Sequence, residues 1–149
     1  MSTIEELRKS VEQLYEYRNK YYSISPIEKY SLKECDVNAK LQETLELLQS
    51  AKEECEKKEK AVYCMLYGKA LNVKREYDQL AFDYLSKSVK LNPKLTEAWN
   101  ELGECYWKKG DLKASLNCFE GCLKYDKMDK VALRNLSMLL RQLGDTAIE

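Results

Sequence analysis

The sequence contains no histidine, and only two prolines and five glycines occur among its 149 residues. The lack of histidine removes the side chain that most often binds metals and transfers protons near neutral pH. A G-x-S-x-G nucleophile motif, a P-loop and a glycine-rich phosphate loop are also missing. Because proline and glycine are rare, helix is favoured over strand throughout. We therefore expect an all-α protein that is not an enzyme and that needs no cofactor or metal.

The charge balance and the hydropathy of the chain argue against two further classes of function. The chain carries 25 basic and 25 acidic side chains, so its formal net charge is zero. This balance argues against nucleic-acid binding through a general basic surface, which needs a clustered excess of cations. No apolar run approaches the roughly 20 residues of a membrane span, and the polar N-terminus is unlike a signal peptide. We expect a soluble cytoplasmic protein that binds neither nucleic acid directly nor a membrane.

Six cysteines are present, yet neither disulfides nor a zinc site is expected. No signal peptide indicates an oxidising compartment, and no C-x2-C pair offers the usual zinc-ligand spacing. Cys105, Cys118 and Cys122 occupy small or apolar positions of the repeat described next. We expect reduced thiols that behave as small buried hydrophobic side chains.

The stretch 96–127 carries the strongest pattern in the sequence. Its first half has the W-x2-L-G-x2-Y spacing of a tetratricopeptide repeat, a 34-residue helix-turn-helix unit. The matching residues are Trp99, Leu102, Gly103 and Tyr106. Ser115 and Phe119 continue the pattern on a second helix, and Gly110 is placed to end the first helix in a left-handed conformation. Small residues at Gly103 and Ser115 allow the two helix backbones to approach closely.

The repeat period extends on both sides of this stretch, behind a helical leader. Upstream, the first repeat matches only in part and needs one extra residue in the turn around 73–78. Downstream, Gly144 and Asp145 repeat the Gly110–Asp111 pair and predict another helix end. The expected fold is all-α, with an N-terminal helical hairpin over 1–60, a degenerate repeat over 61–95, the strong repeat over 96–129 and a partial repeat over 130–149. Because no polar capping helix follows, we expect the N-terminal portion of a longer solenoid.

The leader is expected to form two antiparallel helices over 3–22 and 26–57. Thr3 with Glu6, and Ser25 with Glu28, have the spacing of capping boxes. The charge-rich segment 53–60 indicates a hinge or a solvated helix end. Several tyrosines crowd the end of the first helix, and packing between helices is a better explanation for them than a peptide-binding platform.

Glu101 and Glu104 lie one helical turn apart, which would suit an acid-base pair in a cleft. No pocket pattern accompanies them, so we expect both carboxylates on a solvated helix surface.

A repeat solenoid offers a concave surface lined by the first helix of each unit. The second, fifth, ninth, twelfth and thirteenth positions of each repeat face inward, which in the first repeat includes Met65, Lys69, Asn72 and Val73. The predicted peptide-binding groove consists of Asn100, Glu104, Trp107, Arg134, Met138 and Arg141. Trp107 is either groove-lining or packed by neighbouring helices. Arg134 and Arg141, seven residues apart, are placed to capture a carboxylate; the alternative is that both are merely solvated.

Four segments resemble one family of tetratricopeptide-repeat proteins: G-K-A-L-N-V (68–73), L-S-K-S-V-K-L-N-P (85–93), E-A-W-N-E-L-G-E-C-Y-W-K-K-G-D (97–111) and N-L-S-M-L-L-R-Q-L (135–143). That family comprises factors of tubulin autoregulation, which also act as stress-responsive cofactors of a nuclear acetyltransferase.

The resemblance implies a non-enzymatic adaptor in the cytoplasm and nucleus. Such factors bind the nascent N-terminal peptide of tubulin at the ribosome and recruit adaptors that trigger tubulin mRNA decay. Arg141 matches, by its place in S-M-L-L-R-Q-L, the groove arginine that reads the glutamate of the peptide. The alternative is a generic repeat scaffold or co-chaperone module that captures C-terminal carboxylates.

Overall fold

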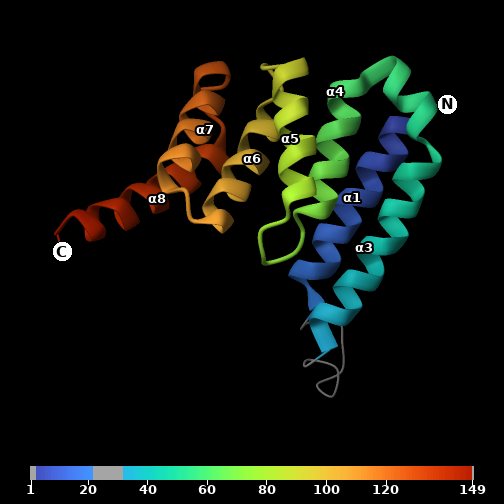
Figure 1. The fold of residues 1–149 in the computed structure, drawn as a ribbon, viewed down its shortest axis with the longest axis horizontal. Coiled ribbons are helices and arrows are strands. Elements are labelled where there is room, and N and C mark those ends of the chain that lie inside the picture. Colours follow the sequence, from blue (N-terminus) through green and yellow to red (C-terminus); the bar gives the residue numbers. More distant parts are fainter. Residues whose placement is uncertain (1–2, 22–31, 149) are drawn as a thin grey trace.

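The computed structural model describes residues 3–21 and 32–148, and within these ranges every regular element is a helix. The predicted all-α architecture is confirmed. Figure 1 shows the helices arranged along one long axis from the leader to α8, with α1 between α3 and α4 and the two ends of the chain far apart. The helices are α1 (Thr3–Asn19), α3 (Lys33–Ser50), α4 (Lys52–Leu71), α5 (Gln79–Leu91), α6 (Thr96–Lys109), α7 (Leu112–Tyr125) and α8 (Lys130–Ile148).

The leader forms the antiparallel pair expected from its apolar stripes (Figure 1). Leu7, Val11 and Leu14 of α1 are almost completely buried, as are Leu41 and Leu48 of α3. Burial of a leucine or valine side chain contributes roughly 1.5–3 kcal/mol, so this seam accounts for the pairing. The tyrosines at the end of the first leader helix also contact α3: Nζ of Lys40 lies 5.6 Å from the ring centroid of Tyr17, and the hydroxyl of Tyr21 donates a hydrogen bond of 2.5 Å to Oδ2 of Asp36.

The second leader helix is shorter than predicted. It ends at Ser50, and a separate helix begins at Lys52 after the turn at Ala51. The predicted hinge at 53–60 contains a kink, because Glu59 has non-helical dihedral angles (φ −140°, ψ 65°). This segment is rich in acidic and basic residues and has no apolar stripe along one helix face. Packing of its own side chains therefore does not hold it in one continuous helix. The capping box at Ser25 and Glu28 lies outside the described residues, as does the side chain of Thr3 in the other predicted capping box.

Two helix pairs, α4–α5 and α6–α7, form the repeats. Gly103 allows the closest approach in the second pair, because a Cβ atom there would lie 2.7 Å from Cε1 of Phe119. The hydroxyl of Ser115 donates a hydrogen bond of 2.8 Å to the carbonyl of Gly103. Gly110 ends α6 at φ 94°, as predicted. The turn of the first pair is much longer, because α4 ends at Leu71 and Asp78 caps the start of α5.

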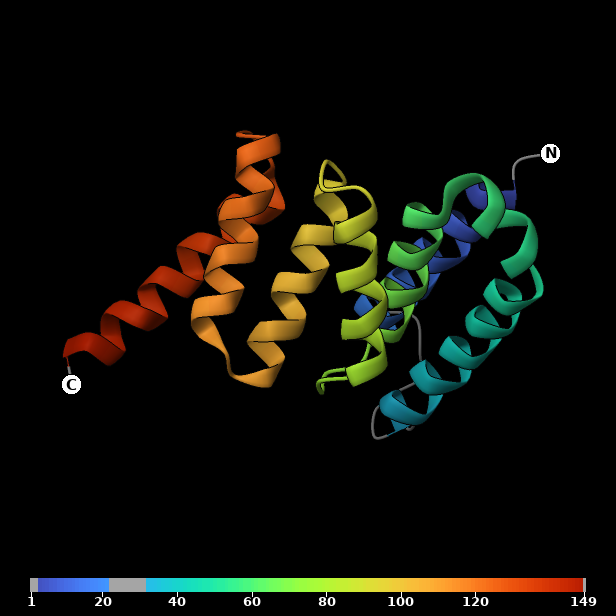
Figure 2. The same ribbon diagram turned by 45° about the horizontal axis from the view of Figure 1, so that its top comes forward.

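α8 continues beyond the predicted turn. Gly144 lies inside the helix, whereas Gly110 is the one glycine at positive φ in the described chain. Among the described residues, α8 is not followed by a second helix of its own repeat. No packing contact of that kind therefore favours a turn at Gly144. Figure 2 shows α8 projecting from the body of the solenoid, next to α7.

Candidate functional site

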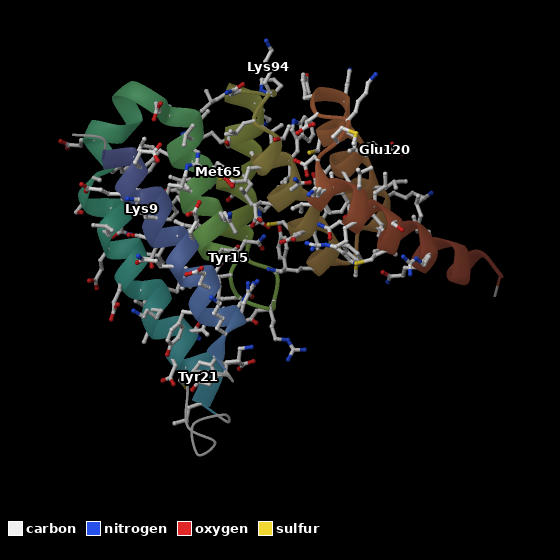
Figure 3. All side chains as sticks on the ribbon, turned by 180° about the vertical axis from the view of Figure 1, so that it is seen from behind. Lys9, Tyr15, Tyr21, Met65, Lys94 and Glu120 are labelled. Carbon is white, nitrogen blue, oxygen red and sulfur yellow. The ribbon has the colours of Figure 1, made fainter. Side chains whose placement is uncertain are left out.

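The inner face of the first repeat is covered by α1. Residues in α4 and just after it were expected to line an open groove. Three of them, Met65, Asn72 and Val73, are each at most 1% exposed. In Figure 3, seen from behind, α1 lies in front of α4, and Tyr15 is near the end of that helix. The hydroxyl of Tyr15 lies 2.7 Å from the carbonyl oxygen of Lys69. The expectation of an open surface here was wrong, because the leader occupies it.

Glu101 lies beneath this contact. It is only 8% exposed, so the prediction of a solvated carboxylate was wrong. Tyr15 donates a hydrogen bond of 3.1 Å to Oε1 of Glu101, and Nδ2 of Asn72 donates one of 3.2 Å to the same atom. Burial, reinforced by the nearby charge of Glu104, raises the pKa of Glu101 to about 7. The two donors satisfy a carboxyl group that would otherwise be costly to bury.

Ion pairs extend the contact between α1 and the repeats. Arg8 lies 3.1 Å from Oε2 of Glu97, and Lys69 lies 3.4 Å from Oε1 of the same residue. Arg18 donates a hydrogen bond of 3.2 Å to the carbonyl of Val73. α1 is therefore bonded to α6, to the carbonyl of Lys69 in α4 and to the α4–α5 turn, in addition to its apolar seam.

Lys108 fastens the long α4–α5 turn to α6. Its Nζ donates to the carbonyl of Asn72 at 2.6 Å, to Oδ1 of Asn72 at 2.7 Å and to the carbonyl of Lys74 at 2.7 Å. Burial lowers the pKa of Lys108, while Glu104 acts in the opposite direction. The ammonium group is thus committed to backbone and amide oxygens within the fold.

A pocket of about 270 Å³ opens between α6 and α8, lined by Glu104, Trp107, Lys108 and Asn135. Trp107 is held on two sides. Its Nε1 donates a hydrogen bond of 3.1 Å to Oε1 of Gln142, and its ring meets Phe119 edge to face at 6.2 Å between centroids. Both roles considered for Trp107, lining a groove and packing against neighbouring helices, therefore coexist.

Arg141 lines a different hollow. This one has a volume of about 450 Å³, and its walls are Leu133, Leu136, Ser137, Leu140 and Arg141. The guanidinium of Arg141 donates a hydrogen bond of 3.2 Å to Oγ of Ser137. Neither Arg141 nor Arg134 has an ion-pair partner among the described side chains. The set predicted as one groove is thus divided between two hollows.

The remaining predicted groove residues differ in accessibility. Arg134 and Met138 are exposed on α8. Asn100 is only 5% exposed, and its Nδ2 donates a hydrogen bond of 3.1 Å to Oδ1 of Asp129. That bond joins α6 to the turn before α8, so the placement of Asn100 on an open surface was wrong.

Two residues of the site were missed from the sequence. Asn135 lines the α6–α8 pocket, yet it stands at the sixth position of its repeat, which is not one of the positions expected to face inward. Tyr15 was noted only as one of a tyrosine cluster. No local pattern shows that its hydroxyl reaches a carboxylate 86 residues away.

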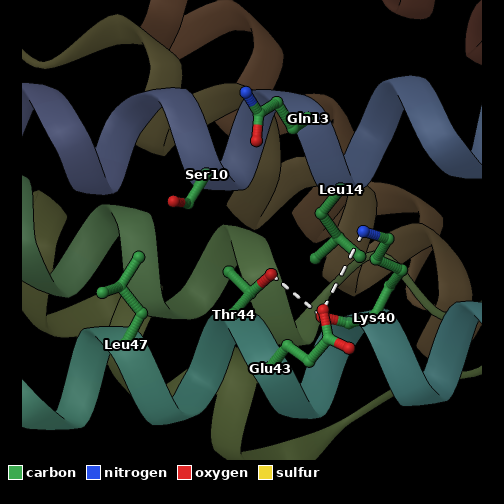
Figure 4. A pocket seen from close by; sticks show the side chains of 7 residues that line it. All are labelled: Ser10, Gln13, Leu14, Lys40, Glu43, Thr44 and Leu47. Atoms are coloured by element: carbon green, nitrogen blue, oxygen red, sulfur yellow. Dashed lines mark hydrogen bonds and ion pairs between the residues drawn. The ribbon is translucent and has the colours of Figure 1, made fainter.

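A third cavity lies within the leader, between α1 and α3. Figure 4 shows its polar lining, in which Lys40 pairs with Glu43 at 3.8 Å and the hydroxyl of Thr44 donates to the carbonyl of Lys40 at 3.0 Å. The volume is about 190 Å³. Since these polar groups bind one another, the cavity offers less to a ligand than the α6–α8 pocket.

The cysteines fit the expected structural role over the described side chains. Cys64, Cys105, Cys118 and Cys122 are buried, whereas Cys35 is exposed. Burial raises the pKa of Cys105 to about 12, so its thiol stays protonated. In the described part of the chain, no cluster of three or more metal-binding side chains occurs. No described helix is both long and apolar enough to cross a membrane.

Comparison with known proteins matches this architecture. The tetratricopeptide-repeat family model matches residues 96–127, the stretch with the strongest sequence pattern. Human tetratricopeptide repeat protein 5 is 44% identical over 140 residues, which is 94% of this chain and 31% of the human protein. The chain contains a tetratricopeptide repeat and is similar over 94% of its length to tetratricopeptide repeat protein 5. The mouse protein is 43% identical over the same coverage.

A shorter match lies within the repeats. The chloroplastic tetratricopeptide repeat domain-containing protein PYG7 of Arabidopsis thaliana is 49% identical over 45 residues, or 30% of this chain and 15% of that protein. The chain thus spans less than a third of the length of the homologues it matches most fully. Tetratricopeptide repeats are protein-interaction modules, so the matches support a protein-binding role.

Proposed function

We propose that the chain is the peptide-reading part of a non-enzymatic adaptor that recognises the nascent N-terminal peptide of tubulin at the ribosome and promotes tubulin mRNA decay. The observation that carries the proposal is the state of Arg141. Its guanidinium is exposed on α8, has no ion-pair partner among the described side chains and borders an apolar hollow. A guanidinium that lacks a carboxylate partner and lies beside an apolar surface suits a peptide in which an acidic side chain adjoins an apolar one.

The homologues support this assignment through their overall similarity, which is 44% identity over 140 residues for the human protein. The ribosome and the mRNA-decay adaptors are further proposed partners, and they come from the family resemblance alone. The same source places the protein in the cytoplasm and nucleus and adds a role as an acetyltransferase cofactor. The chain covers 31% of the human homologue, so these activities are proposed for the whole protein.

The alternative of a co-chaperone module that captures C-terminal carboxylates fits the charges less well. Such a module needs several cationic and amide groups that converge on one carboxylate. Here Lys108 is engaged by three oxygens of the α4–α5 turn, and the carboxylate of Glu104 lines the adjacent pocket. An incoming carboxylate would meet a like charge there.

The decisive experiment measures binding of a fluorescent peptide beginning Met-Arg-Glu-Ile to the full-length protein. Arg141→Ala is expected to weaken binding at least tenfold, or about 1.4 kcal/mol, because the glutamate loses its cationic partner. Arg141→Lys should restore part of the affinity, since lysine keeps the charge but lacks the bidentate fork. Arg75→Ala, an exposed arginine in the distant α4–α5 turn, is the matched control and should bind as the wild type does.

A second peptide, with glutamine in place of the glutamate, identifies the contact. The wild type should bind it at least tenfold more weakly, and Arg141→Ala should bind both peptides equally. Equal affinity of wild type and Arg141→Ala for the glutamate peptide would reject the assignment. Tight binding of a C-terminal EEVD-type peptide that competes at the same site would also reject it.

A further inference from the structure

Three aromatic rings gather near the end of α6, and a lysine ammonium group lies against two of them. Nζ of Lys109 is 5.6 Å from the ring centroid of Tyr77 and 5.8 Å from that of Phe82. Phe82 meets Tyr106 almost at right angles, with an interplanar angle of 82° and 5.1 Å between the centroids. The rings of Tyr77, Phe82 and Tyr106, here called the aromatic cluster, come from the α4–α5 turn, α5 and α6.

The aromatic cluster is accessible and also ordered. Each of its rings is only partly buried, and Lys109 is exposed. The hydroxyl of Tyr77 donates a hydrogen bond of 2.8 Å to Oε1 of Gln79, which fixes the ring at the start of α5. Lys108 holds the same turn through the carbonyl of Lys74. Rings that are ordered before a ligand arrives lose less entropy on binding.

The surroundings of the cluster favour a cation. The faces of aromatic rings attract a positive charge within about 6 Å of the centroid. Burial, followed by the nearby Cys105 and Asp83, raises the pKa of Tyr77. Asp83 accepts a hydrogen bond of 3.0 Å from the amide of Gln79, so its carboxylate stays at this edge of the cluster.

The position of Lys109 marks where a cation fits. Its ammonium group forms no ion pair with a described carboxylate, yet it lies within reach of two ring faces. A lysine stem and head are thus already accommodated beside the rings. The side chain is exposed and flexible, so it can return to water when another cation takes its place.

We propose that the aromatic cluster is a binding site for a trimethylated lysine of a partner protein, and that Lys109 occupies it when no partner is bound. Trimethylation keeps the positive charge and replaces the N–H groups that water binds most strongly, so less hydration is lost beside the rings. An unmethylated lysine has no such advantage over Lys109, which is tethered at the site. The cluster shares no residue with the Arg141 hollow, and the proposal does not rest on the peptide-reading function.

Choline and 3,3-dimethyl-1-butanol test cation recognition, because the alcohol has the shape of choline without its charge. Each is titrated into the full chain, and the chemical shifts of the ring resonances are followed by NMR. Choline should bind at least about fivefold more tightly than the alcohol, as expected for a cation over ring faces. Equal affinities, or no change at the rings of the cluster, would mean that the rings only pack within the fold and would overturn the proposal.

A Gly-Ala peptide with one central lysine tests the class of partner. The trimethyllysine form should bind at least about fivefold more tightly than the unmethylated form and than choline, because its stem adds contacts beside the rings. Equal binding of the two peptide forms overturns the proposal. Tighter binding of choline than of the trimethyllysine peptide would indicate a lipid headgroup instead, and also overturns it.

Variants of the occupant and of the rings complete the test. Lys109→Ala should bind the trimethyllysine peptide at least about threefold more tightly, because the competing cation is gone. Lys113→Ala, at an exposed lysine on α7, is the matched control and should bind as the wild type does. Weaker binding by Lys109→Ala would show that this lysine is not a displaceable occupant, which contradicts the proposal.

The ring variants are Phe82→Leu and Tyr77→Leu, and circular dichroism establishes that each is folded. Either folded variant should lose most of the preference for trimethyllysine, and Tyr77→Leu in the turn serves if Phe82→Leu does not fold. An unchanged preference in a folded ring variant overturns the site. Arg141→Ala should bind the trimethyllysine peptide as the wild type does, so this proposal and the tubulin assignment can fail independently.

Discussion

The hydroxyl of Tyr15 in α1 donates a hydrogen bond of 3.1 Å to Oε1 of Glu101 in α6. The same hydroxyl lies 2.7 Å from the carbonyl oxygen of Lys69 in α4. Burial, followed by the negative charge of Glu101, raises the pKa of Tyr15 well above its usual value, so the proton needed for donation is retained. One hydroxyl thereby connects the leader with both repeats.

Tyr15→Phe removes only this hydroxyl. We expect the free energy of unfolding to fall by about 1–3 kcal/mol, because the single proton of this hydroxyl no longer satisfies a buried acceptor. Urea denaturation at pH 7 measures the change. Tyr125→Phe, at a tyrosine that is 45% exposed on α7, is the control and should alter stability by no more than about 0.5 kcal/mol. Equal stability of Tyr15→Phe and the wild type would contradict the contact.

Stability should decrease as the pH rises from about 4.5 to about 7. The folded state holds the proton of Glu101 more tightly than the unfolded chain does, because burial raises the pKa from 4.5 to about 7. The folded state thus binds more protons in this window, and linkage requires its stability to fall by up to about 3 kcal/mol as the pH rises through it.

Glu101→Gln is the matched control for this titration. The amide oxygen can still accept from Tyr15 and Asn72, but the side chain no longer ionises. The variant should therefore match the wild type near pH 4.5 and exceed its stability at pH 8, as measured by urea denaturation across the range. The same decrease with pH in both proteins would show that another group is responsible.

Lys108→Met should destabilise the chain by roughly 2–3 kcal/mol. The substitution keeps the apolar stem and removes the ammonium group from three oxygens of the α4–α5 turn, which then lose their donor. Thermal unfolding measures the loss, and limited proteolysis should show faster cleavage within 73–78. Lys113→Met replaces an exposed lysine on α7 and should leave both measurements unchanged. Unaltered proteolysis of Lys108→Met would mean that the lysine does not hold the turn.

Gly103→Ala and Gly144→Ala should have opposite outcomes. At Gly103 the new Cβ would lie 2.7 Å from a ring atom of Phe119, so overpacking should cost about 1–3 kcal/mol. At Gly144 nothing lies within 4 Å and the backbone is helical, so alanine should raise helix stability by up to about 1 kcal/mol. Thermal unfolding followed by circular dichroism tests both. A destabilised Gly144→Ala would instead indicate the left-handed turn predicted from the repeat period.

The repeat itself was predictable because its signals are local. Gly103 and Ser115 had to be small for α6 and α7 to approach, and Gly110 had to be able to adopt positive φ. These requirements act at fixed spacing within one helix-turn-helix unit, and therefore appear directly in the sequence. The end of α3 at Ser50 was missed, since charged helix-forming residues continue without a break signal on both sides of it.

The position of α1 was not predictable in the same way. Its apolar stripe showed that it must pack, but not that Arg8 would reach Glu97 or that Tyr15 would reach Glu101. Each of these contacts joins residues more than 80 positions apart, and either acidic residue looks like solvated helix surface when read alone. The same limitation hid the buried state of Asn100, whose partner Asp129 lies 29 positions away in the turn before α8.

The leader helix α1 also closes one end of the inner surface of the solenoid. α1 crosses the inner side of α4 and reaches Glu97 and Glu101 on α6, so an extended ligand that lies along α8 and α6 meets a wall there. An internal segment of a long polypeptide would have to leave the surface at that wall, whereas a chain terminus can stop against it. Under the proposed function, this closed end would favour a chain terminus over an internal segment as the ligand.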